Sequence, residues 1–102
     1  MTTMHEDDAL FHNASEEAVK LGNRLVDADR EADPWDIASG MLAGAVHFWL
    51  YTRQPCEDPR CDSCNEINTA ELRLQRLMEE IRQSAMESEY YHSPHDANVG
   101  RA

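Results

Sequence analysis

All three cysteines of the chain lie within nine residues of one another. Their spacing is C-x4-C-x2-C, from Cys56 through Cys61 to Cys64. Zinc takes four tetrahedral nitrogen or sulfur ligands, and a C-x2-C turn presents two thiolates to one ion. The residue types and the spacing therefore predict a metal site, with zinc as the ion, in which one ligand position is not filled by a cysteine.

The fourth ligand has several candidates in the sequence. His47 is the best of them, because it lies near the end of the apolar segment that precedes the cysteines, and the following loop can fold back over it. The alternatives are two C-terminal histidines (His92 and His95), two acidic residues of the loop (Glu57 and Asp62) and a residue of another chain.

The redox state of these cysteines depends on the compartment. The N-terminal residues lack the basic start and apolar run of a secretory signal. The most apolar stretch, residues 37–51, is shorter than the roughly 20 apolar residues of a membrane-spanning helix. We therefore expect a cytoplasmic protein with reduced thiols, for which metal chemistry is favoured. Inert thiols and a redox-active pair stay open as alternatives.

The charge of the chain limits its partners. The 102 residues include 20 acids and nine bases, for a net charge of −11. Nucleic-acid binders need a basic face, and anionic membranes attract basic segments, so neither partner is expected. Ten of the acids lie within residues 1–36, and this acidic surface suits a basic protein partner. No phosphate loop, dinucleotide fingerprint or nucleophile elbow is present, which favours a non-enzymatic role.

Three helices are expected to position the cysteines. Apolar residues recur at steps of three and four, the spacing of one helix face, and no segment alternates with period two. Asp33 before Pro34 indicates the start of the second helix, and Asn68 with Glu71 has the capping-box spacing at the third. The predicted helices cover about residues 6–31, 34–53 and 67–89.

These elements predict an all-α fold, a small three-helix up-down-up bundle. We expect one helical domain over residues 1–91 and a flexible tail over residues 92–102. The connection of residues 54–66 is longer than the usual two to eight residues between bundled helices, and it contains every cysteine.

The second helix is apolar on more than one face, which is typical of a central helix or of one shared with another chain. Two flanking helices cover only part of such a circumference, so we expect a homodimer through this helix. The predicted interface consists of Trp35, Ile37, Met41, Gly44, Phe48 and Tyr51.

Together these features predict a small acidic protein-interaction or regulatory module with a structural zinc loop. One alternative is a metal-dependent enzyme subunit or a metal sensor, with an open coordination position at the ion. A second alternative is an acidic decoy that binds a nucleic-acid-binding protein.

Overall fold

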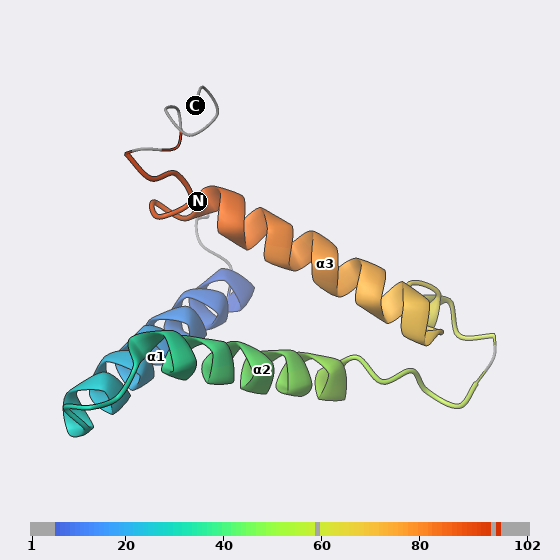
Figure 1. Ribbon diagram of the computed structural model, residues 1–102. Helices are drawn as coiled ribbons and strands as arrows, with labels where there is room; N and C mark the ends of the chain where they lie inside the picture. Colours follow the sequence, from blue (N-terminus) through green and yellow to red (C-terminus); the bar gives the residue numbers. More distant parts are fainter. Residues whose placement is uncertain (1–5, 59, 95, 97–102) are drawn as a thin grey trace. The chain divides into compact units, whose positions relative to one another are not determined.

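A computed structural model describes residues 6–58, 60–94 and 96 (Figure 1). Among these residues there are three α-helices and one short 3-10 helix, and there is no strand. The α-helices are α1 (Glu6–Ala28), α2 (Pro34–Thr52) and α3 (Ala70–Glu87), and the 3-10 helix η1 (Asp62–Cys64) lies between α2 and α3. The predicted all-α class is confirmed, and so is the cysteine-containing loop between the second and third helices.

The chain divides into two compact units, residues 1–48 and residues 49–102. The first unit contains α1 and most of α2, and the second contains the last turn of α2, the cysteine loop and α3. The up-down-up order of the helices and the single domain over residues 1–91 stay predictions. No helix in the described part of the chain combines the length and the apolar character that a membrane crossing requires.

The turn between α1 and α2 is set by two aspartates. The carboxylate of Asp29 accepts a 3.0 Å hydrogen bond from the backbone N–H of Glu31. Such local side-chain bonds compete with helical ones, and α1 ends at Ala28, three residues before the predicted end. The carboxylate of Asp33 accepts a 2.9 Å hydrogen bond from the N–H of Trp35, which confirms the predicted start of α2.

The helices of the first unit approach each other at Gly22. A Cβ atom added there would lie 3.1 Å from Sδ of Met41 on α2. An apolar groove of about 590 Å³ lies beside this contact, and an added Cβ at Gly40 or Gly44 would meet nothing within 4 Å. The groove residues are Ala18, Leu21 and Leu25 of α1, with Ile37, Gly40, Met41, Gly44 and Ala45 of α2.

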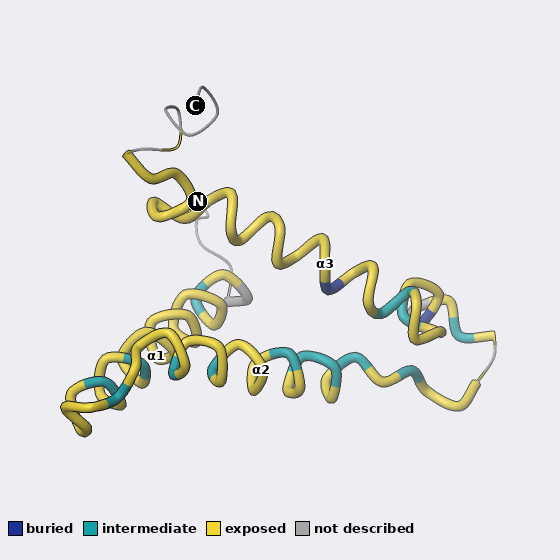
Figure 2. Tube along the Cα trace, in the orientation of Figure 1, coloured by how far each residue is buried: buried dark blue, intermediate teal, exposed yellow. Residues whose placement is uncertain are grey.

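Side-chain burial is sparse in the described residues. Among the described residues, the buried hydrophobic ones are Cys64 and Leu77, and both belong to the second unit (Figure 2). No residue of α2 is buried, and Trp35 is 79% exposed. Several apolar side chains of α2 are therefore exposed, Leu42 and Phe48 among them.

Helix α3 (Ala70–Glu87) begins three residues later than predicted. Thr69 is the N-cap, and its hydroxyl accepts a 3.1 Å hydrogen bond from the N–H of Leu72. The predicted cap at Asn68 was therefore wrong by one residue, because two adjacent residues both have side chains that suit an N-cap. The helix ends at Glu87, two residues before its predicted end, where the N–H of Ser88 donates to the carbonyl of Ala85.

The predicted flexible tail falls mostly on residues that the structure does not describe, namely 95 and 97–102. Within its described part, the N–H of Ser93 donates to the carboxylate of Asp96 at 2.8 Å, and the N–H of Asp96 donates to the carbonyl of Ser93. A local turn therefore follows α3.

Candidate metal centre

Two successive turns bring the cysteines together in the loop. The carboxylate of Asp58 accepts a hydrogen bond from the N–H of Arg60, and its carbonyl accepts one from the N–H of Cys61. The N–H of Cys64 donates to the carbonyl of Cys61 at 3.2 Å, and this bond closes the C-x2-C segment. The N–H of Ile67 then donates to the carbonyl of Cys64 at 2.9 Å. The backbone hydrogen bonds of the loop therefore hold Cys61 and Cys64 in one short helical turn.

The sulfur atoms of the three cysteines converge. All three Sγ atoms lie within 4.8 Å of one another, and the Sγ atoms of Cys56 and Cys64 are 3.5 Å apart. Zn–S bonds of about 2.3 Å in a tetrahedron imply S···S separations of about 3.8 Å. None of the three cysteines is in a disulfide, and small side-chain movements would fit their sulfurs to one ion.

The environment of the cluster is graded from buried to open. Cys64 is 8% exposed, Cys61 is intermediate and Cys56 is exposed. The backbone N–H of Cys56 donates to Sγ of Cys64 and by itself lowers the pKa of that thiol. The side chains of Cys56 and Cys61, together with burial, act in the opposite direction, and the pKa of Cys64 is raised overall. Thiolates at this spacing repel one another, and a cation between them removes that repulsion.

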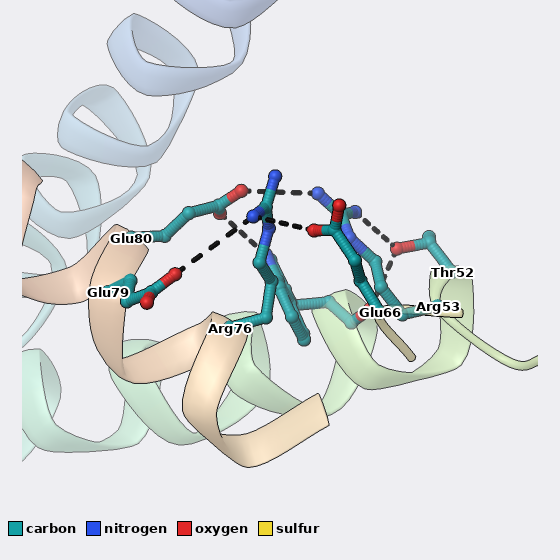
Figure 3. A network of polar contacts seen from close by, with 7 residues as sticks. Thr52, Arg53, Glu66, Arg76, Glu79 and Glu80 are labelled. Carbon is teal, nitrogen blue, oxygen red and sulfur yellow. Dashed lines mark hydrogen bonds and ion pairs between the residues drawn. The ribbon is translucent and has the colours of Figure 1, made fainter. Parts of the chain in front are cut away.

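The base of the loop is closed by contacts between the end of α2 and α3, shown in Figure 3. The indole Nε1 of Trp49 donates a 2.6 Å hydrogen bond to Oε2 of Glu80, and Nη2 of Arg53 lies 3.3 Å from Oε1 of the same carboxylate. The guanidinium of Arg53 also lies over the Trp49 ring, 4.4 Å from its centroid. We call Trp49, Arg53 and Glu80 the loop clamp.

A second group of contacts fastens the other end of the loop to α3. Nη1 of Arg76 lies 2.8 Å from Oε1 of Glu66, and this ion pair joins the loop to α3 (Figure 3). Within α3 itself, Glu79 lies 4.0 Å from the same nitrogen. Nη1 of Arg73 donates a 2.9 Å hydrogen bond to the carbonyl of Ile67. Because both ends of the loop are attached to α3, Cys56 is held close to the C-x2-C turn. None of the residues that attach the loop to α3 was predicted from the sequence.

The other predicted ligands are distributed over the chain. The described residues bring the three cysteines together as one group of potential metal ligands, and no histidine or carboxylate belongs to that group. His47 is exposed on α2 within the first unit, His92 is exposed after α3, and His95 lies outside the described residues. The fourth ligand therefore stays a prediction, with His47, His92 and a residue from outside the chain among the candidates.

The chain matches no protein-family model, no curated protein and no solved structure. The chemistry of the centre therefore follows from its own donor atoms. Thiolate ligands select soft or borderline ions such as Zn²⁺ and Cu⁺ over the hard ions Mg²⁺ and Ca²⁺. A group of three thiols that is open at one edge can bind such an ion and leave a coordination position for a further ligand.

Proposed function

We propose that this protein is a small acidic interaction or regulatory module in which Cys56, Cys61 and Cys64 bind one zinc ion. The observation that carries the proposal is the convergence of three cysteine sulfurs, none of them in a disulfide, within 4.8 Å of one another. Few residues of the loop are cysteines, so crowding alone does not explain why their sulfurs lie together. Their proximity is the arrangement that a tetrahedral thiolate site requires.

The structural role of the ion is supported by the small amount of buried surface around it. Cys64 and Leu77 are the buried hydrophobic residues among those described, so apolar packing contributes little to fixing the loop. Metal binding adds free energy to folding when the site does not exist in the unfolded chain. The ion thus takes the part that a hydrophobic core plays in larger proteins.

The exposure of Cys56 favours a second candidate function. A structural zinc site is closed by four protein ligands, whereas catalytic zinc keeps one position for water or substrate. Because Cys56 is exposed and Cys64 is buried, the open side of the cluster faces solvent at Cys56. A metal sensor or a small metal-dependent enzyme subunit would use that side. X-ray absorption spectroscopy separates the two functions, since the open site includes an exchangeable oxygen ligand.

The test is the metal content of untagged protein prepared without chelator. We expect one zinc per chain by mass spectrometry, and with cobalt a thiolate-to-metal absorption band. Cys61→Ser removes a ligand and is expected to lose most of the metal and to melt at a lower temperature. Ser84→Ala, on an exposed position of α3, is the matched control and should keep both. Protein without metal, whose melting does not respond to chelator, would exclude the proposal.

A further inference from the structure

The number of donors at the centre matters for its choice of ion. Within the described residues the cluster offers three sulfur atoms and no fourth ligand atom. Zinc is four-coordinate in protein sites, so three sulfurs leave its coordination incomplete. Trivalent arsenic and antimony carry a lone pair and form three bonds to sulfur in a pyramid. For such an ion the donors of this cluster are a complete set.

The charge around the cysteines points in the same direction. Residues 56–66 contain four acids and one base, Arg60. Zn²⁺ with three thiolates leaves a net charge of −1 within this acidic segment, whereas As³⁺ with three thiolates is neutral. The acids are solvent-exposed and their effect is screened by salt. They therefore favour the neutral arsenic centre over the negatively charged zinc centre, but only by a small amount. The loop is suited to a centre that adds no negative charge.

We propose that the cluster of Cys56, Cys61 and Cys64 binds trivalent arsenic or antimony as a three-coordinate ion, an inference that rests on the proposed metal-binding function. With arsenous acid the reaction is an exchange without oxidation or reduction. Three As–O bonds break, three As–S bonds form, and each thiol proton leaves with one hydroxyl of arsenous acid as water. Arsenous acid enters at Cys56, the exposed thiol, and the bond to buried Cys64 completes the pyramid.

The spacing of the sulfurs supports binding by all three thiols rather than by two. Cys56 and Cys64 are 3.5 Å apart at Sγ, and Cys61 lies within the same 4.8 Å group. The first As–S bond therefore places arsenic within reach of both remaining thiols. Intramolecular closure of this kind raises the effective concentration of the second and third ligands, and it makes the chelate tighter than its single bonds.

The experiment is a titration of reduced, metal-free protein with arsenite, read by mass spectrometry and by alkylation of the remaining thiols. We expect a species that has gained one arsenic and lost three hydrogens, with no cysteine left to alkylate. Cys56→Ser should weaken arsenite binding by about tenfold or more, because one of the three bonds is lost. The Ser84→Ala variant should bind as the parent does.

A parallel zinc titration of the same sample separates the two proposals. Zinc uptake that arsenite blocks one for one supports both. Arsenite binding without zinc uptake supports the present inference and excludes the zinc module. Zinc uptake together with an arsenic adduct that leaves one thiol alkylatable, or with no adduct at all, overturns the three-coordinate site and leaves the zinc module standing.

Discussion

Trp49 and Glu80 are 31 positions apart in the sequence, and the indole nitrogen of the first donates a 2.6 Å hydrogen bond to the carboxylate of the second. Arg53 contacts the other oxygen of that carboxylate. Glu80 of α3 thus contacts both Trp49 and Arg53, and α2 ends between these two residues. The cysteine loop therefore begins at a point that is held against α3.

Removal of the carboxylate at the loop clamp is expected to loosen the metal centre. Glu80→Ala deletes the acceptor for both Trp49 and Arg53. The Arg53 contact is partly exposed and is worth about 0–1 kcal/mol, so the loss of stability should be near 1 kcal/mol when the indole bond is included. Urea unfolding and competition with a zinc chelator measure the stability and the zinc affinity.

Two variants sharpen this test. Glu80→Gln keeps an oxygen acceptor for the indole and should lose less than Glu80→Ala. Glu79→Ala removes a neighbouring carboxylate with one long contact of 4.0 Å to Arg76, and it should change neither quantity measurably. Equal behaviour of Glu79→Ala and Glu80→Ala would mean that the clamp does not position the loop.

Zinc loading is expected to depend on pH in a definite direction. The pKa of Cys64 is raised, so this thiol carries its proton at neutral pH in the metal-free protein. Zinc binds the thiolate, and loading must therefore release that proton. The apparent zinc affinity should rise with pH through the neutral range. Chelator competition at several pH values measures it, and an affinity that is constant from pH 6 to pH 8 would contradict thiolate ligation.

Two glycines of the first unit provide a matched pair for its packing. Alanine in a helix interior is more favourable than glycine by roughly 0.5–1 kcal/mol. At Gly40 nothing lies within 4 Å of an added Cβ, so Gly40→Ala should gain that amount. At Gly22 the new Cβ would lie 3.1 Å from Sδ of Met41, and the gain should be reduced or reversed. Urea denaturation compares them, and equal gains would mean that Met41 does not pack on Gly22.

The fold class was predictable because the signals for a helix, its apolar periodicity and its capping residues, lie within the helix sequence or next to it. The start of α2 at Pro34 follows from Asp33, whose carboxylate caps its own neighbours, and no distant residue is needed. The exact helix ends were less predictable, because neighbouring residues compete for the same local hydrogen bonds. Asp29 forms its own turn and ends α1 early, and Thr69 rather than Asn68 caps α3. Adjacent residues of similar capping ability cannot be ranked from periodicity.

The candidate site was predictable only in part. The C-x4-C-x2-C spacing identified Cys56, Cys61 and Cys64, because ligand types and spacing along a loop are visible in one dimension. The contact of Trp49 with Glu80 was not visible, since both residues also fit ordinary helix positions. Contacts between sequence-distant polar residues carry no periodic signal. The only hint was an arginine, Arg53, directly after an apolar helix.

A homodimer through helix α2 stays a prediction. The 19 residues of α2 include one charged residue, Asp36, and none of them is buried. Trp35 is 79% and Tyr51 is 72% exposed, and soluble monomers avoid apolar surface of this kind. The net charge of −11 opposes self-association, but every charged residue except Asp36 lies outside α2, and salt screens the repulsion. The dimer should therefore be tighter at physiological salt than at low salt.

Light scattering over a concentration series tests this assembly, and Gly44 provides the decisive variant. Gly44 lines the apolar groove with open space before it, so Gly44→Leu fills the room that a side chain of the second copy would occupy. The Kd of the dimer should increase by about tenfold or more. Ala43→Leu adds comparable bulk beside the groove, where Ala43 does not line it, and should leave the dimer intact. A mass of 11.7 kDa at every concentration in physiological salt would mean that α2 is not a dimer interface.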